Sequence, residues 1–332
     1  WIWVALKRPM PSVNIWRVKA KSQFKNLSVH GPIRMTAQHT NIKIKDATHH
    51  PIQIGVGLRH VHYADVLAQP SDIDFIEVHS ENFFANGGAS ISFLREVAQR
   101  YPVSLHSTAL GLGSYANIPG GYLDSLHALV KDVNPILLSD HAAFAWGEFN
   151  KMPMHAGDLL PVAFDQNNLT IMASNIDRVQ QLTGHQLKVE NLSAYIVPDG
   201  SSMSETEFLV KLTELTGCEL LIDLNNLVVN ANNFSNLNAI EYSKQWLAQI
   251  PSKAVGELHL AGFTQVANGE LAIDDHSQPV SDTVWELYDF ALQRFGNVPT
   301  LIEWDNNLPS WDVLVGEVSK ARKIAQQVVH YG

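Results

Sequence analysis

The sequence predicts an α/β protein built as a single (β/α)8 barrel, or TIM barrel. From Ile52 onward, short runs rich in β-forming residues alternate with stretches long enough for helices, and eight such units are present. Strands that alternate with helices pair in parallel, and eight parallel strands close into a barrel. The composition of the 332 residues, 45% hydrophobic and 17% charged, is that of a chain with a substantial core.

Each of the eight expected strands is an apolar run that ends in polar residues. In chain order the runs are IGVGLR (54–59), DFIEVH (74–79), PVSLH (102–106), PILLSDH (135–141), QLKVEN (186–191), ELLIDLN (219–225), VGELHL (255–260) and TLIEWD (300–305). The carboxyl ends of barrel strands line the active site. We therefore expect the polar endings to surround one mouth.

Helical patterns with start and stop signals lie between these runs. The clearest cover residues 91–101, 169–184, 204–217 and 284–296. Ser204 and Glu207 have the spacing of a capping box, and Gly184, Gly217 and Gly296 stand where helices should stop. An open, doubly wound sheet is the alternative arrangement, but no Gly-rich phosphate loop follows the first strand.

The chain divides by charge into a basic N-terminal part and an acidic remainder. Residues 1–45 contain nine Lys or Arg and no acidic residue; removing these nine from the formal net charge of −10 leaves −19 for the rest. We interpret residues 1–45 as an extension, disordered or non-native before Met35, with an organellar targeting segment as the alternative. Residues 50–325 are then expected to form one catalytic barrel.

The bulk composition also argues against several classes of protein. An acidic body repels nucleic acid, and no apolar stretch approaches the roughly 18 residues that a membrane span needs. We therefore expect neither nucleic acid nor membrane as a partner. Cys218 is the only cysteine, which excludes an internal disulfide and fits a reducing, cytoplasmic location. Its thiol is expected to be buried and structural.

Imidazole, carboxylate and amide groups gather at the strand ends and in the loop after the seventh strand. They are His62, Glu77, His79, Glu81, Asn82, His106, Asp140, His141, Glu190, Asn191, Asp223, Asn225, Asn226, His259, Asp274, Asp275, His276, Glu303 and Asp305. So many ionised carboxylates cannot be buried together without compensation. Metal ions turn this repulsion into shared coordination, and a sulfur-free ligand set suits zinc, iron or manganese.

Taken singly, each of these residues also has a structural interpretation. A lone strand-end His is more often hydrogen-bonded than a ligand, and Glu257 and Asp305 can be ordinary ion-pair partners. Asn82, Asn191 and Asn225 can tie down loops through backbone hydrogen bonds. Six of the eight strands nevertheless end in potential ligands, and structural roles do not explain this joint pattern.

Nine motifs occur in order between residues 54 and 320. They are GVGLRHVHY, EVHSENFF, VSLHSTALGLGS, LLSDHAAF, VENLSAY, TGCELLIDLNNLVVNA, ELHLAGF, IDDHSQPV and TLIEWD. Together they resemble the multinuclear non-haem iron-dependent oxidative enzymes, a family that includes the B-protein of methanobactin biosynthesis. The resemblance implies a xylose isomerase-like TIM barrel, similar to those of trinuclear endonucleases and sugar isomerases.

The resemblance also implies two or three irons of mixed valence and nine ligands. The implied sets are His106, His141 and a bridging Glu190 for a first iron; Asp223, His259 and Glu303 for a second; and Asn226, Asp274 and His276 for a third. Asp223 and Asn226 would thus form a D-x-x-N pair that serves two adjacent metals. In IDDH, Asp275 stands where the family commonly has a hydroxyl residue, and the roles of Asp275 and Asp140 stay open.

The implied reaction is the iron- and O2-dependent oxidation of a cysteine in a ribosomally synthesised peptide. The peptide thiolate would bind one iron and O2 an adjacent one. His62, His79, Glu81 and Asn82 match no ligand position, and we predict that they contact substrate or transfer protons. A Cys-containing precursor peptide and a small leader-presenting protein are the expected partners.

Two other functions stay open on the sequence alone. A sugar isomerase or phosphodiesterase-type hydrolase would use the same barrel and similar ligands, with zinc, manganese or magnesium and without O2. A nuclease of this kind would need a basic groove, which the acidic body disfavours. A non-catalytic metal-binding or chaperone protein is the second alternative. Such a protein does not require full ligand sets with open coordination positions, which argues against this alternative.

Overall fold

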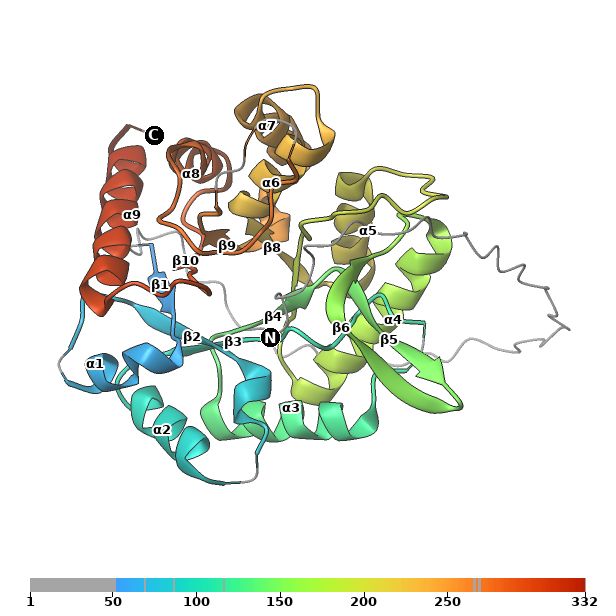
Figure 1. Ribbon diagram of the computed structural model, residues 1–332, viewed down its shortest axis with the longest axis horizontal. Helices are drawn as coiled ribbons and strands as arrows, with labels where there is room; N and C mark the ends of the chain where they lie inside the picture. Colours follow the sequence, from blue (N-terminus) through green and yellow to red (C-terminus); the bar gives the residue numbers. More distant parts are fainter. Residues whose placement is uncertain are drawn as a thin grey trace, which may run out of the picture. The chain divides into compact units, whose positions relative to one another are not determined.

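Eight parallel strands close into a barrel in the computed structural model, which describes residues 52–331 except positions 69, 86, 116, 265, 266, 268 and 269 (Figure 1). The strands are β1 (Ile54–Gly57), β2 (Phe75–His79), β3 (Val103–His106), β4 (Leu137–His141), β7 (Lys188–Glu190), β8 (Glu219–Asp223), β9 (Val255–Leu260) and β10 (Thr300–Ile302). Around the barrel they follow the order β1-β10-β9-β8-β7-β4-β3-β2. The predicted (β/α)8 fold is confirmed, whereas the interpretation of residues 1–45 lies outside the described residues.

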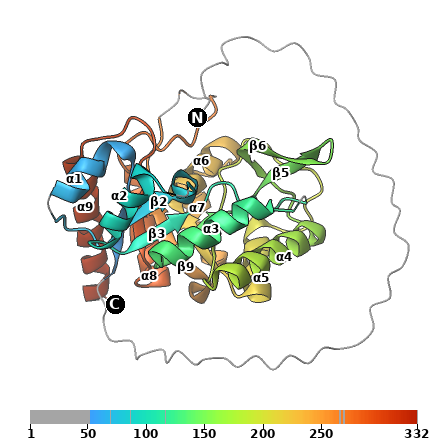
Figure 2. The same ribbon diagram turned by 90° about the horizontal axis from the view of Figure 1, so that it is seen from below.

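Helices lie on the outside of the barrel (Figures 1 and 2). They are α1 (Tyr63–Ala68), α2 (Ala89–Ala98), α3 (Gly120–Val133), α4 (Gln166–Thr183), α5 (Glu205–Thr216), α6 (Leu224–Phe234), α7 (Ala239–Gln249), α8 (Asp282–Phe295) and α9 (Trp311–Tyr331). Short 3-10 helices cover His60–His62, Ser80–Phe83 and Ser252–Ala254. Among the described residues, no helix is both long and apolar enough to cross a membrane.

The predicted helices and their end signals are confirmed. Helices α2, α4, α5 and α8 occupy the four predicted ranges, with ends shifted by one to three residues. The Ser204 hydroxyl accepts a hydrogen bond from the backbone N–H of Glu207 (3.1 Å) and caps α5. Gly184 and Gly217 end α4 and α5 with φ of 71° and 69°, a left-handed conformation that glycine adopts without a steric penalty, and Gly296 ends α8.

An antiparallel hairpin between β4 and α4 was not predicted. It consists of β5 (Ala143–Phe149) and β6 (Met152–Pro161), and Figure 2 shows it standing apart from the barrel strands. Asn150 and Lys151 form its two-residue turn, with φ of 51° and 63°, as in type I′ turns. Because Lys replaces the usual Gly at the second position, the common hairpin signature is missing from the sequence.

The strand predicted over 219–225 is shorter than expected, because a helix begins inside that range. Strand β8 ends at Asp223, whose carboxylate accepts a hydrogen bond from the backbone N–H of Asn226 (2.7 Å). This bond caps α6, which starts at Leu224. Asn225 and Asn226 therefore lie in the first helical turn, beside the ends of the strands.

The inside of the barrel is apolar at one end and polar at the other. Phe75, Leu137 and Leu301 come from three non-adjacent strands and pack together inside the barrel. Gly55 leaves room for this cluster, since a Cβ there would lie 2.5 Å from the Phe75 ring. Residues two positions further along each strand face the same way, so Glu77 and the strand-end residues lie above this apolar layer.

Candidate metal centre at the mouth of the barrel

The parallel register brings the polar strand ends together in neighbouring pairs. His79 on β2 is the register partner of His106 on β3, and Asp223 on β8 is the partner of His259 on β9. His141 on β4 likewise lies beside Glu190 on β7, although the hairpin and α4 separate these strands in sequence. The predicted convergence of the strand ends on one mouth is therefore confirmed.

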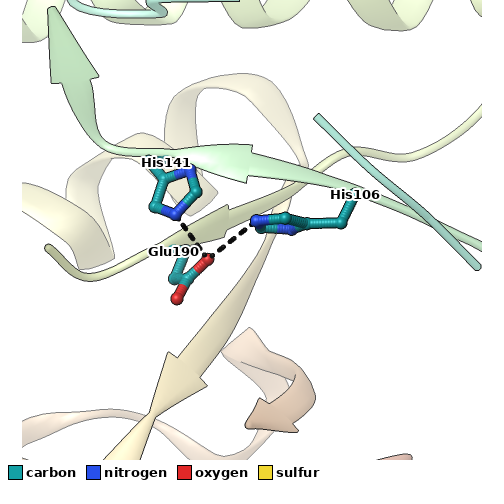
Figure 3. Close-up of side chains that lie close together, drawn as sticks. All are labelled: His106, His141 and Glu190. Carbon is teal, nitrogen blue, oxygen red and sulfur yellow. Dashed lines mark ion pairs between the residues drawn. The ribbon is translucent and has the colours of Figure 1, made fainter. Parts of the chain in front are cut away.

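Two histidines face one carboxylate oxygen at the ends of β3, β4 and β7 (Figure 3). Glu190 Oε2 lies 3.5 Å from Nε2 of His106 and 3.2 Å from Nε2 of His141. A hydrogen bond between Nδ1 of His106 and the Ser139 hydroxyl (2.8 Å) orients the first ring. Burial lowers the pKa of both histidines, to about 4 for His141. Both imidazoles are thus in the neutral form that binds metal.

A second carboxylate, Glu303, is also shared by two histidines. Its Oε2 lies 3.0 Å from Nδ1 of His259 and 3.4 Å from Nδ1 of His276. Burial alone would raise the pKa of Glu303, but His276 and His259 outweigh it and hold this pKa well below its usual value. Burial would likewise lower the pKa of His259, yet Glu77 and Glu303 raise it well above normal. Without a metal, this part of the mouth is an ion-pair network.

Asp223 and Asn226 lie between these two clusters. Asp223 Oδ2 has no hydrogen-bond partner and lies 3.7 Å from Nε2 of His276. The Asn226 amide nitrogen donates to the carbonyl of Asn191 (3.0 Å), and the Asn226 Oδ1 has no hydrogen-bond partner. Burial raises the pKa of Asp223 to about 7. Both residues thus present an oxygen without a hydrogen-bond partner.

Asp274 joins the centre through hydrogen bonds to its neighbours. It accepts from the Ser193 hydroxyl (3.0 Å) and from the Asn225 amide (2.8 Å). Its Oδ1 also lies 2.8 Å from Nε2 of His276, an ion-pair distance without hydrogen-bond geometry. The loop that carries Asp274 and His276 is therefore attached to α6 and to the segment after β7 by polar contacts.

Five groups of three side chains bring ligand atoms within 4.8 Å of one another. They are His106, His141 and Glu190; Glu77, His259 and Glu303; His79, Glu303 and Asp305; Glu190, Asp223 and His259; and Asp223, His276 and Glu303. Seven of the nine predicted ligands belong to these groups. The other two, Asn226 and Asp274, contact Glu190 and His276.

The donor set fits metal ions. Buried polar atoms without hydrogen-bond partners are costly, and several of them meet here: Glu77 Oε1, Glu190 Oε2, Asp223 Oδ2, Asn226 Oδ1, His259 Nε2 and His276 Nε2. Burial and the Asp223 carboxylate are among the causes that raise the pKa of Glu190 well above normal, a sign of crowded negative charge. A cation would satisfy the lone pairs and relieve this repulsion.

The four residues predicted to act on substrate fall in two places. His79 and Glu81 lie at the mouth: Nε2 of His79 is 3.1 Å from Nη2 of Arg59, and Glu81 accepts a hydrogen bond from the Thr108 backbone N–H (2.8 Å). His62 instead donates to the carbonyl of Pro309 (2.9 Å), and Asn82 is exposed. Among the described residues, His62 belongs to none of the five ligand groups.

A layer of acidic side chains beneath the mouth was not assigned as ligands. Glu77 accepts a hydrogen bond from Ser104 (2.8 Å), and its free oxygen lies 3.7 Å from Nε2 of His259; Glu257 lies equally far from the same nitrogen. Both glutamates are fully buried. Each stands two positions before a strand-end histidine, so strand alternation is the signal that could have identified them.

The arginine that follows β1 was also missed. Arg59 pairs with Asp305 and Glu303 and is almost fully buried. The ion-pair interpretation of Asp305 is thereby confirmed. No pattern in the sequence marks Arg59, because its importance depends on carboxylates that follow it by more than 240 residues.

Similar solved structures support the fold alone. L-ribulose 3-epimerase aligns with a TM-score of 0.51 and 14% identity, covering 83% of this chain and 98% of that one. A xylose isomerase domain-containing protein of Salmonella typhimurium LT2 aligns with a TM-score of 0.50 and 13% identity, covering 85% and 97%. The barrel is thus xylose isomerase-like, as predicted.

Sequence similarity, in contrast, identifies the family of this chain. A UPF0276 protein of Chromobacterium violaceum is 40% identical over 272 residues, which cover 81% of this chain and 94% of the relative. Residues 53–326 match the family described as RiPP precursor modification enzyme MbnB/TglH/ChrH, where RiPP denotes a ribosomally synthesised and post-translationally modified peptide. The resemblance carried by the nine motifs is confirmed, and the chain belongs to this family of enzymes that modify RiPP precursors.

Proposed function

We propose that this enzyme uses two or three irons and O2 to oxidise a cysteine of a RiPP precursor peptide. The observation that carries the proposal is the sharing of carboxylates: Glu190 and Glu303 each belong to more than one ligand group. Groups that share a ligand hold their metals side by side. Bound iron would supply adjacent redox-active positions, one for the peptide thiolate and one for O2.

The first ligand group is arranged to bind a metal with little rearrangement. His106 is fixed by Ser139, and its Nε2 and that of His141 already face Glu190. Both rings are buried and neutral, so neither has to lose a proton before it binds. These residues would hold the metal, while Glu190 would link this position to Asp223 and His259.

Glu81 is the candidate for handling a proton at the substrate. Its Oε1 accepts hydrogen bonds from the Thr108 backbone and from the Tyr122 hydroxyl, whereas its buried Oε2 has no partner. This second oxygen is available to accept a proton from the peptide. His79 is the last residue of β2, two positions before Glu81, and there it would contact substrate. The corresponding roles of His62 and Asn82 stay predictions.

A cavity beside the mouth offers space for part of a peptide. The cavity has a volume of about 1020 Å³ and lies between the hairpin, α4 and the loop that precedes α3. Tyr115, Phe144 and Trp146 are among its lining residues. The indole of Trp146 lies 6.5 Å from the ring of Tyr122, which hydrogen-bonds to Glu81. A small partner protein would present the leader of the peptide and guide its cysteine from this cavity to the metals.

Metal analysis combined with Mössbauer or EPR spectroscopy tests the proposal. Protein purified anaerobically from iron-supplied cells should contain two or three irons with a coupled mixed-valent signal. His106→Ala and Glu190→Ala should lose that signal. Tightly bound zinc or manganese without iron would contradict the oxidase proposal and point to a sugar isomerase or a phosphodiesterase-type hydrolase.

The substrate is tested separately with a peptide. A short Cys-containing open reading frame beside the gene is the first candidate for the precursor. The iron-loaded enzyme should consume O2 and change the mass of that peptide, together with its leader-binding partner where one is encoded. A Cys→Ser peptide serves as the control, and equal O2 consumption with both peptides would contradict oxidation at cysteine.

A further inference from the structure

One of the five ligand groups already contains a cation. The guanidinium of Arg59 donates from Nε to Asp305 Oδ1 (2.7 Å), and its Nη2 lies 2.5 Å from the same oxygen and 3.3 Å from Glu303 Oε1. The same Nη2 lies 3.1 Å from Nε2 of His79. His79, Glu303 and Asp305 are the three members of one group, so the guanidinium contacts all of them.

The contact with His79 removes a potential ligand atom. A guanidinium has only N–H donors, so Nε2 of His79 must be the acceptor in this hydrogen bond. The proton of the neutral ring is then on Nδ1. With Arg59 in place, Nε2 has no lone pair left for a metal ion.

The chain provides a specific place for this guanidinium. Gly57 lies two residues before Arg59, and a Cβ at Gly57 would lie 3.1 Å from Nη1 and 3.3 Å from Cζ of Arg59. The side chain of Arg59 is only 10% exposed and folds over this glycine. A buried guanidinium with two carboxylate partners is a structural part of the mouth and not a solvated surface charge.

In the other ligand groups, Arg59 pairs only with the shared carboxylate of Glu303. Among the ion pairs of the described residues, Arg59 is the only Lys or Arg that pairs with a member of the five groups. Lys188, also buried, pairs instead with Glu219, which belongs to none of them. At His79 and Asp305, the guanidinium of Arg59 therefore supplies the positive charge that a metal ion would otherwise bring.

We propose that Arg59 takes the place of a metal ion between His79, Glu303 and Asp305, and thereby confines metals to the other groups. By holding Glu303 Oε1, Arg59 also leaves Oε2 directed at His259 and His276. Arg59 is in this sense a positioning residue that limits how many metals the mouth binds. The inference rests on the proposed metal centre.

Crystals of the wild-type protein soaked in Co²⁺ test this directly through anomalous scattering. We expect cobalt beside His106 and His141 and beside His276, and none between His79 and Asp305. Cobalt at that last position, with Arg59 displaced, would overturn the inference and leave the proposed metal centre standing. Absence of cobalt from the whole mouth would overturn both.

Metal stoichiometry in solution provides a second test. In a Co²⁺ titration of metal-free protein, Arg59→Met should bind one more equivalent than the wild type, because His79, Glu303 and Asp305 lose their cation. Arg59→Lys should keep the wild-type count, and Arg59→Met combined with Asp305→Asn should return to it. An unchanged or lower count for Arg59→Met would overturn the inference.

A matched variant controls for the loss of one arginine. Arg95 pairs with Asp132 on the surface, away from the ligand groups. Arg95→Met should therefore leave the cobalt count unchanged. Should Arg59→Met fail to fold, the wild-type crystals decide the question alone.

Discussion

Asp223 uses its two carboxylate oxygens for different tasks. Oδ1 accepts a hydrogen bond from the backbone N–H of Asn226 (2.7 Å) and caps α6, whereas Oδ2 has no hydrogen-bond partner and faces His276 at 3.7 Å. The start of the helix and the ligand position therefore depend on one side chain. A carboxylate and an amide stand at the end of a buried strand for this reason.

Substitutions at Asp223 should separate these two tasks. In metal-free protein, Asp223→Ala should lose about 1 kcal/mol of unfolding free energy with the cap, while Asp223→Asn should keep most of it because an amide oxygen also caps. Both variants should bind metal more weakly. Urea unfolding in chelator and a Co²⁺ titration measure the two effects.

Ser204 provides the control, because it caps α5 outside the ligand groups. Ser204→Ala should lose a similar free energy without any effect on metal binding. Wild-type metal affinity in Asp223→Ala would show that Asp223 is not a ligand.

Removal of the Ser139 hydroxyl should weaken metal binding without altering any ligand. The hydroxyl orients His106 through Nδ1 (2.8 Å), and loss of such a contact typically reduces metal affinity 10- to 100-fold. Competition with a chelator measures the dissociation constant of Ser139→Ala. The control is Ser125→Ala, which removes an exposed hydroxyl on α3. Equal affinities in both variants would contradict the orienting role of Ser139.

Glu205 should make the stability of the fold depend on pH. Burial raises the pKa of Glu205 from its usual 4.5 to about 7, although a hydrogen bond from the Trp246 indole opposes the shift. The folded state therefore holds this proton more tightly than the unfolded state. The resulting stabilisation is complete below about pH 4.5 and is lost as the pH rises through about 7.

Thermal unfolding of Glu205→Gln tests this prediction. In chelator, the variant should gain stability relative to the wild type as the pH is raised from 5.5 to 8.5, because Gln has no charge to bury. Glu207→Gln on the same helical turn is the control, since Glu207 is exposed and pairs with Lys211. A wild-type minus variant difference that is constant with pH would contradict the prediction.

Overpacking inside the barrel should destabilise the protein without touching the metal centre. A Cβ at Gly55 would lie 2.5 Å from the Phe75 ring, so Gly55→Ala should cost about 1–3 kcal/mol. Adding Phe75→Leu should restore part of this loss. Gly316→Ala in α9 is the control, because a Cβ there meets nothing within 4 Å and alanine favours a helix. Equal unfolding free energies for Gly55→Ala and the wild type would contradict this account of the core.

The barrel and most of the candidate centre could be predicted from local patterns in the amino-acid sequence. Eight apolar runs with polar ends are a local pattern, and a closed parallel barrel necessarily brings those ends to one mouth. The strand order and polar ends therefore predict that a set of strand-end residues are neighbours: His106, His141, Glu190, Asp223 and His259. The helix ends at Gly184 and Gly217 were equally local, since they depend on a backbone conformation that glycine alone adopts easily.

The contacts that each of these groups makes could be read from the three-dimensional structure alone. The structure shows that Asp223 caps a helix and that Glu303 pairs with two histidines. It also shows that His62 donates a hydrogen bond to Pro309 and does not join the ligand groups. It also placed Arg59 between His79 and Asp305. Such roles depend on distances between residues far apart in the chain, and no periodicity or spacing along the sequence encodes those distances.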